Sequence, residues 1–382
     1  MGTFALGLDA YVLTGLLPGI GSSFGTSPAA AGQVVTGFTV AYALGSPVLS
    51  VLSARASRRT VLLVALGIFA AANLASAAAP DLWVLISARV VAGAGAGLYA
   101  PSAAAAATGL VAREQRGRAL AVVLGGLTIA TVLGVPVGLL LGVHVGWRAT
   151  LLLVAALALA AGAGIAVLLP PITAPPPPGL RERFAALGDR FVLGRVTVML
   201  VLGIANLGLY TYLATVLHHS AQVTTGQLPL YLLVWGVGGG VGNTLIGWLL
   251  DQGRDAGQLL TITICLLAVA LCLIPVLATG PVGVALVLFA WGFAAWSLQV
   301  PLQYQLTTTV PEHAATAVAL LASAVYLGSA IGSAGNGILL DATSTAVLPL
   351  AAGALALVAL GLNQVTAHRV EVSERRATGS LR

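Results

Sequence analysis

The chain has 382 residues, of which 58% are hydrophobic and only 7% are charged, and its mean hydropathy is +1.01. Because soluble domains carry about 25% charged residues, this composition excludes an ordinary water-soluble enzyme, a disordered protein and a nucleic-acid-binding protein. The net charge of +6 comes from arginines, and their positions indicate membrane topology, as described below, and not an acidic partner.

Apolar runs fill almost the whole chain, and about 20 apolar residues are enough to cross a bilayer. Charged residues, prolines and glycine clusters interrupt these runs and set their limits. We predict spans in the first half at 3–22, 32–53, 60–79, 82–108, 118–141 and 148–169. We predict further spans at 194–217, 227–250, 257–279, 281–309, 314–340 and 344–367. The chain is therefore predicted to be an all-α integral membrane protein with twelve transmembrane helices.

The main polar connection lies between the sixth and seventh predicted spans and contains four consecutive prolines, Pro175 to Pro178. It divides the chain into an N-terminal six-helix bundle, a cytoplasmic linker, a C-terminal six-helix bundle and a cytoplasmic tail, at 1–169, 170–193, 194–367 and 368–382. The halves repeat at a nearly constant offset, since Glu114 matches Glu312 and Gly134 matches Gly332, both 198 residues later. Two bundles related by pseudo-twofold symmetry are typical of secondary transporters.

Arginine placement predicts the orientation of the chain. All arginines except Arg89 and Arg148 lie in alternate connections or in the C-terminal tail. The positive-inside rule assigns these connections to the cytoplasmic side. We therefore expect both termini to be cytoplasmic in a multi-pass membrane protein, with the lipid bilayer as its surroundings.

Asp9 is the carboxylate that lies deep in the first predicted span. Burial disfavours the charged form of a carboxylate, so such a group can take up and release a proton as a cavity opens to alternate sides. We assign a role in proton coupling to Asp9. The alternative is an acid near the start of the span that simply reaches cytoplasmic water.

Arg89 lies inside the fourth predicted span and is followed by Gly93, Gly95 and Gly97. A guanidinium inside a membrane is costly unless it faces a partner or water. We expect Arg89 to face a central cavity and to have a functional role. Snorkelling to the outer membrane interface is the alternative.

The connections after the second and eighth spans lie on the cytoplasmic side and carry charged residues. The first contains Arg55, Arg58 and Arg59, and the second contains Asp251 and Arg254, which can pair at the surface. On the residues alone, these arginines can act as simple topology anchors.

The fifth span carries small residues at four-residue spacing, including Gly126, Gly134 and Gly138. These give one smooth helix face for close packing. Pro136 in the same segment removes one backbone hydrogen bond and can kink the helix.

Polar residues elsewhere in the spans can line a cavity or form hydrogen bonds between helices. The candidates are Tyr11, Gln33, Asn73, Asn206, Tyr210, Tyr212, Asn243, Gln299, Gln303 and Asn336.

With these motifs the chain resembles the major facilitator superfamily, in particular its drug:proton antiporter branch of arabinose-efflux-like and chloramphenicol-resistance exporters. Arg89 to Gly93 matches the R-x-x-x-G pattern of that family. The segment 126–138 is similar to the antiporter signature G-x-x-x-G-P-x-x-G, although Val135 separates Gly134 from Pro136. The segments 11–18 and 146–148 also carry the resemblance. The loop at 50–59 departs from the family pattern, with Ser, Ala and Ser where Gly, Asp and Gly are usual. The resemblance implies a gating role for this loop and for its counterpart after the eighth span, and a role of their arginines as simple topology anchors stays open.

The resemblance implies proton-coupled export of a small amphipathic molecule, such as a drug, an antibiotic or a sugar-like compound. Two bundles would rock about a central cavity, and Arg89 would tune Asp9 or the substrate by its charge. The resemblance also implies a monomer in a bacterial inner membrane that needs no cofactor.

Three other functions stay open. The same fold serves proton-coupled importers of small solutes, and the chain could also be a membrane receptor or scaffold that transports nothing. A membrane-embedded enzyme is the weakest alternative, because no set of nucleophile, base and metal ligands converges in the sequence. His218 and His219 fall in an external connection without further ligand types, so we expect no metal site. The sequence contains no P-loop and no lysine, which excludes ATP-driven transport by this chain alone.

Overall fold

The computed structural model describes all residues except 54–55, 113–114, 171–186, 312–313 and 380–382. The described part contains 12 helices that are long and apolar enough to cross a membrane. The predicted all-α fold with twelve transmembrane helices is confirmed.

The helices of the first half follow the predicted spans closely. They are α1 (Gly2–Phe24), α2 (Pro28–Leu52), α3 (Arg58–Ala77), α4 (Leu82–Gly109), α5 (Arg116–Ile129), the π-helical turn η2 (Ala130–Gly134), α6 (Val135–His144) and α7 (Trp147–Leu168). The fifth predicted span is thus built from three successive elements.

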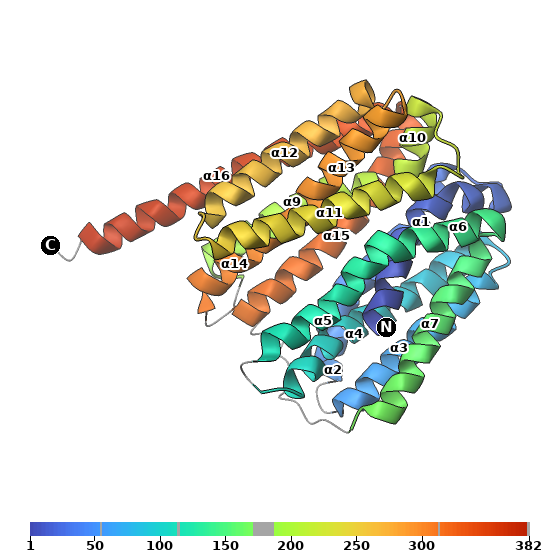
Figure 1. Ribbon diagram of the computed structural model, residues 1–382, viewed down its shortest axis with the longest axis horizontal. Coiled ribbons are helices and arrows are strands. Elements are labelled where there is room, and N and C mark those ends of the chain that lie inside the picture. Colours follow the sequence, from blue (N-terminus) through green and yellow to red (C-terminus); the bar gives the residue numbers. More distant parts are fainter. Residues whose placement is uncertain (54–55, 113–114, 171–186, 312–313, 380–382) are drawn as a thin grey trace.

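The second half begins a few residues earlier than expected. Its helices are α9 (Arg190–Thr211), α10 (Leu213–Ala221), α11 (Leu228–Asp251), α12 (Ala256–Leu277), α13 (Pro281–Ser297), α14 (Gln299–Thr309), α15 (Ala314–Ala342) and α16 (Val347–Gly379). His218 and His219 therefore lie in the last turn of α10 and not in a connection. The last helix continues well beyond 367, the expected end of the twelfth span (Figure 1).

Several helices begin at polar side chains that cap the first turn. Asp81 Oδ1 accepts a hydrogen bond from the backbone N–H of Val84 at 2.9 Å, and Asp255 Oδ2 accepts one from Gln258 at 2.7 Å. A carboxylate at this position satisfies an otherwise unpaired N–H and interacts favourably with the helix dipole. In a chain with so few charges, these caps fix where the spans begin.

The small-residue face of the fifth span packs closely, as the spacing predicted, and the structure shows that its partner is α1. A Cβ placed on Gly134 would lie 2.9 Å from the Phe4 ring, and one on Gly138 would lie 2.9 Å from Leu8 Cδ1. A Cβ on Gly126 would collide with Thr3. In the second half, Gly332 lies against the backbone of α9, so both members of the repeated pair contact the first helix of their own half. Glu114 and Glu312 lie outside the described residues.

The turn η2 lies directly before the proline of the fifth span. The N–H of Val135 donates to the carbonyl of Ala130, five residues earlier, which is the hydrogen bond of a π-helix. Pro136 has no N–H to donate. The backbone therefore departs from α-helical geometry immediately before this proline.

The helices form two groups, α1 to α7 and α9 to α16 (Figure 1). The groups contact each other where α2 packs against α15, where α11 packs against η2 and α6, and where α1 packs against α10. Helices α1, α6 and α10 all terminate at the same end of the molecule. Within the described residues, α5 makes no comparable contact with α11. The two groups are therefore joined most closely at that end.

Candidate functional site

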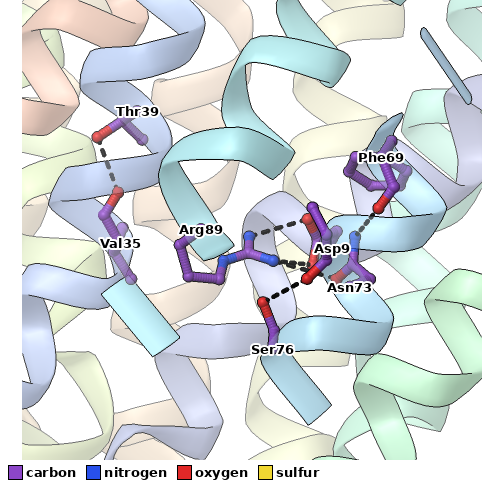
Figure 2. Close-up of polar contacts among 8 residues, drawn as sticks. Asp9, Val35, Thr39, Phe69, Asn73, Ser76 and Arg89 are labelled. Carbon is purple, nitrogen blue, oxygen red and sulfur yellow. Dashed lines mark hydrogen bonds and ion pairs between the residues drawn. The ribbon is translucent and has the colours of Figure 1, made fainter. Parts of the chain in front are cut away.

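A buried ion pair joins α1 to α4. Arg89 Nη1 donates to Asp9 Oδ1 and Arg89 Nη2 donates to Asp9 Oδ2, both at 2.8 Å (Figure 2). Both side chains are 0% exposed. The alternative in which Asp9 reaches water is therefore wrong, and so is the alternative in which Arg89 snorkels to the membrane interface.

Asn73 of α3 completes what we call the polar cluster, namely Asp9, Asn73 and Arg89. Arg89 Nη1 also donates to Asn73 Oδ1 at 3.1 Å, and Asn73 Nδ2 donates to the carbonyl of Phe69 at 3.0 Å (Figure 2). The guanidinium carbon of Arg89 lies 4.6 Å from the centroid of the Phe38 ring, within the range of a cation–π contact. The arginine is therefore held by a carboxylate, an amide and an aromatic ring.

Glycines in α4 bring these groups together. A Cβ on Gly93 would collide with the carbonyl of Phe38 in α2, and a Cβ on Gly95 would lie 3.0 Å from the backbone N of Phe69 in α3. Both neighbouring helices can approach α4 closely because these side chains are missing. Arg89, one turn before Gly93, is thereby placed beside both Phe38 and Asn73.

The expected cavity-facing position of Arg89 is wrong for this conformation. Its side chain lies among α1, α2, α3 and α4 and lines neither of the two hollows described below. The physical reason is that Asp9 and Asn73 supply all the hydrogen bonds that its two Nη atoms make.

On the opposite side of α1 lies what we call the aromatic cluster, formed by Tyr11, Tyr210, Trp235 and Trp296. Tyr11 follows Asp9 by two residues, which is about 200° around a helix. Its ring centroid lies 5.8 Å from Tyr210, 6.3 Å from Trp235 and 5.8 Å from Trp296. Tyr11 comes from the first group of helices, whereas the other three rings come from α9, α11 and α13 of the second.

A small cavity of about 20 Å³ lies beside these rings, with room for about one water molecule. Its lining is Tyr11, Met199, Leu202, Gly203, Asn206, Leu207, Trp235, Ala295, Trp296, Leu298, Gln299 and Val325. None of these described lining residues is charged. Asn206 Oδ1 accepts a hydrogen bond from Trp291 Nε1 at 2.6 Å.

The structure places some predicted cavity residues at this cavity and others elsewhere. Tyr11, Asn206 and Gln299 line it, and the Tyr210 hydroxyl lies 3.4 Å from the carbonyl of Tyr11. Tyr212 is completely buried and donates to the carbonyl of Ser333 at 3.1 Å. The remaining candidates line neither hollow: Gln33, Asn73, Asn243, Gln303 and Asn336.

A larger hollow of about 390 Å³ lies between the end of α1, the start of α2 and the region of α10. His218 and His219 are among its lining residues. It lies at the end of the molecule where the two groups of helices are joined, away from both the polar cluster and the aromatic cluster.

The predicted gating residues are only partly described. Arg55 lies outside the described residues. Arg59 donates to the carbonyl of Ala166 at the end of α7, and Arg58 is buried. Asp251 and Arg254 are exposed, and the ion pair that they can form is not present in the described part of the chain in this conformation.

Sequence reasoning missed Trp235 and Trp296 and misplaced Asn73. Both tryptophans lie in the interior of predicted apolar spans, where nothing in the sequence distinguishes them from other core residues. Asn73 was a candidate for the cavity, but its amide instead holds Arg89.

Comparisons with known proteins agree with this architecture. The sequence profile of the Major Facilitator Superfamily matches residues 1–333. The chloramphenicol resistance protein of Streptomyces lividans is 34% identical over 366 residues, covering 93% of this chain and 92% of that protein. The inner membrane transport protein YdhP of Escherichia coli is 30% identical over 345 residues, covering 90% and 87%. A probable sugar efflux transporter of Helicobacter pylori is 24% identical over 360 residues, covering 94% and 92%.

Proposed function

Because this chain belongs to the major facilitator superfamily, we propose that it exports a small amphipathic molecule in exchange for protons. It is a multi-pass membrane transporter and not an enzyme. The export direction, the proton coupling and the substrate class are the proposal.

The observation that carries the proposal is the bidentate contact between Asp9 and Arg89. While Asp9 is ionised, the two buried charges neutralise each other. When Asp9 binds a proton, Arg89 becomes a buried cation without a counter-charge, which is strongly unfavourable. Protonation therefore favours a different arrangement of α1 and α4, in which Arg89 reaches water or the substrate.

The burial of Asp9 couples its protonation to movement of the surrounding helices. Asp9 is 0% exposed here, so a proton reaches it only after the helices around it move. In the proposed cycle Asp9 is protonated from the outside and releases its proton to the inside as the pair with Arg89 re-forms. Proton and substrate then bind alternately and are carried in opposite directions, so inward proton flow drives the substrate outward.

Orientation and export direction have separate support. With the termini and the arginine-rich connections on the cytoplasmic side, the end where the two groups of helices are joined faces outward, and substrate enters from the cytoplasm of a bacterial cell. Export is favoured by the signature-like segment 126–138 and by the relatives named for chloramphenicol resistance and sugar efflux. In this proposal the two groups are the bundles at 1–169 and 194–367, and the protein works as a monomer.

The test is proton movement in inverted membrane vesicles that carry a pH gradient. Amphenicols, cationic dyes and small sugars are added in turn to vesicles with the wild-type protein, the Asp9→Asn variant or the Asp341→Asn variant. Asp341 is an exposed carboxylate near the end of α15, so it is a matched control. We expect at least one compound to dissipate the gradient with the wild type and with Asp341→Asn, but not with Asp9→Asn.

Two results contradict the proposal. If Asp9→Asn moves protons like the wild type, the coupling site lies elsewhere. If the compound accumulates only in right-side-out vesicles, the protein is an importer and the export direction is wrong.

A further inference from the structure

The second group of helices contains a buried arginine of its own, Arg195 of α9. Its side chain is 3% exposed, and its Nη1 donates a hydrogen bond to Asn363 Oδ1 of α16. Asn363 Nδ2 in turn donates to Thr261 Oγ1 of α12 at 3.1 Å. The guanidinium carbon of Arg195 lies 5.0 Å from the centroid of the Phe191 ring. Arg195 is therefore enclosed where α9 and α12 both pack against α16.

Arg195 has no counter-charge in the part of the chain that the structure describes. Arg89 is paired there with Asp9, but no carboxylate forms an ion pair with Arg195. Its Nε is buried without an acceptor, and its Nη2 donates to no described group. Since a buried cation without a counter-charge is strongly unfavourable, an arginine in this position indicates a further group that binds to it.

The helix ends around Arg195 do not supply a counter-charge. Helices α9 and α12 both begin on this side of the molecule, so both present the positive end of the helix dipole there. Their caps, Asp189 and Asp255, accept hydrogen bonds from backbone N–H groups of their own first turns. Helix α16 continues to Gly379 (Figure 1), so its terminal carbonyls lie farther along the chain. The group that completes this site is therefore an anion.

Gln364 of α16 connects this site to the lipid-facing surface. It is exposed, and its Nε2 lies 3.4 Å from the same Thr261 Oγ1 to which Asn363 donates. The next residues along α12 and α16, Ile262 and Val365, are 59% and 50% exposed. Exposed apolar side chains of membrane-spanning helices contact the hydrocarbon of the bilayer. A ligand with a negatively charged headgroup and apolar tails matches both features.

We propose that the junction of α9, α12 and α16 binds the phosphate headgroup of an anionic phospholipid, with Arg195 as its counter-charge and Gln364 Nε2 as a second donor. Basic pockets between membrane helices bind such headgroups, and arginine forms strong charge-assisted hydrogen bonds with phosphate oxygens. A free phosphate ion offers the same charge, but it has no tails to pack against Ile262 and Val365. The inference goes beyond the proposed transport function and does not depend on it.

The test is lipid binding to the purified full-length protein in detergent micelles. Native mass spectrometry counts the bound lipid molecules as dioleoylphosphatidylglycerol or dioleoylphosphatidylcholine is added, each with and without inorganic phosphate. Both lipids carry a phosphate, but only in phosphatidylcholine is its charge balanced by a cation of the same headgroup. We expect the wild type to bind phosphatidylglycerol at least about fivefold more tightly than phosphatidylcholine, and we expect millimolar inorganic phosphate not to displace it.

Two variants locate the site. Arg195→Gln removes the buried charge but keeps a side-chain donor for Asn363, and it should weaken binding of phosphatidylglycerol by about tenfold. Arg190→Gln is the matched control, because it removes the same charge from the exposed first residue of the same helix. It should change binding by less than about twofold.

Thermal unfolding in the same detergent distinguishes lipid binding from a purely structural role of Arg195. Without phosphatidylglycerol, Arg195→Gln should unfold at the same temperature as the wild type or higher, since it lacks the uncompensated buried charge. With phosphatidylglycerol, only proteins that keep Arg195 should be stabilised beyond the effect of phosphatidylcholine. If Arg195→Gln is less stable by the same amount with and without the lipid, Arg195 only packs the helices and the inference is overturned.

The binding measurements can overturn the inference as well. Equal binding of the two lipids by the wild type does so without any variant. Unchanged binding of phosphatidylglycerol by Arg195→Gln, or an equal loss in Arg190→Gln, shows that the lipid binds elsewhere. If inorganic phosphate displaces phosphatidylglycerol, the ligand is a phosphate ion from solution and the assignment to a lipid is wrong.

Discussion

The two halves of the chain join corresponding helices by different chemistry. In the first half, α1 is joined to α4 by the charged pair Asp9–Arg89 at 2.8 Å. In the second half, α9 is joined to α13 by a neutral hydrogen bond between Asn206 and Trp291 at 2.6 Å. One architecture therefore uses two buried charges at one site and none at the other.

Glycine contacts show that α4 of the first half corresponds to α13 of the second half. Gly93 of α4 faces the carbonyl of Phe38 in α2, and Gly292 of α13 faces the carbonyl of Trp235 in α11. This match aligns Arg89 with Leu288, which is 0% exposed. In the second half, the fold therefore holds an apolar residue at the position that corresponds to Arg89. Since buried ion pairs add little stability compared with apolar packing, the charges of the first half are better explained by function.

The largest predicted effect comes from breaking the polar cluster on one side only. Asp9→Ala leaves Arg89 buried without its counter-charge, and it should lower the free energy of unfolding by about 3–5 kcal/mol. Denaturant unfolding in detergent measures this.

The double variant Asp9→Ala with Arg89→Leu sharpens the comparison, because it gives the first half apolar residues like those of the second. It should recover most of the lost stability, yet it should move no protons in the vesicle assay. If the double variant is as unstable as Asp9→Ala alone, the first half does not accept apolar residues at this site as the second half does.

A second effect tests the glycines that the halves share. Gly93→Ala and Gly292→Ala each place a methyl group against the backbone of a neighbouring helix, and each should destabilise the protein by about 1–3 kcal/mol. Gly240→Ala is the control, because a Cβ there meets nothing within 4 Å. It should leave stability unchanged or raise it by up to about 1 kcal/mol. A large loss of stability for Gly93→Ala and none for Gly292→Ala would contradict the correspondence of α4 and α13.

A third, smaller effect tests the neutral link. Asn206→Ala leaves the buried Nε1–H of Trp291 without its acceptor, which should cost about 1–2 kcal/mol of unfolding free energy. Asn243→Ala is the matched control, because Asn243 is exposed on α11. A loss as large as that of Asp9→Ala would show that the neutral link is as important to the fold as the charged one.

The smallest effect is expected at the exposed loop after α11. Asp251→Asn should change the unfolding free energy by less than about 0.5 kcal/mol, since Asp251 is exposed and not ion-paired with Arg254. Thermal unfolding in detergent measures the change. A clear loss of stability would indicate that this loop forms an interaction in solution that this conformation lacks.

Much of the fold could be predicted from the sequence, because the apolar runs are long and the few polar residues mark their ends. Asp9 and Arg89 could be singled out for the same reason, since each is a charge in an apolar segment. Their contact could not be predicted. It depends on how closely α4 approaches α2 and α3, and this is set by tertiary packing at Gly93 and Gly95.

The polar residues that were expected to line the cavity also show that contacts set by tertiary packing cannot be predicted from the sequence. Asn206 and Tyr212 lie six residues apart on nearly continuous helix, but only Asn206 lines the cavity, whereas Tyr212 packs against α15. A polar residue in an apolar span indicates that some partner exists. It does not indicate on which side of the helix that partner lies. The tryptophans of the aromatic cluster gave no polar contrast at all.

The π-helical turn in the fifth span has a consequence for insertions and deletions. Residues spaced by four drift about 40° per step around an α-helix, so Gly126 and Gly142 would differ by about 160° in direction. Both nevertheless face α1, contacting Thr3 and Leu16. The extra residue in η2 reduces this difference in direction by about 100°. Deleting one residue within 130–134 would return the turn to α-helical geometry and leave later residues facing as before. We therefore expect this span to tolerate the loss of one residue there, but not the gain of one.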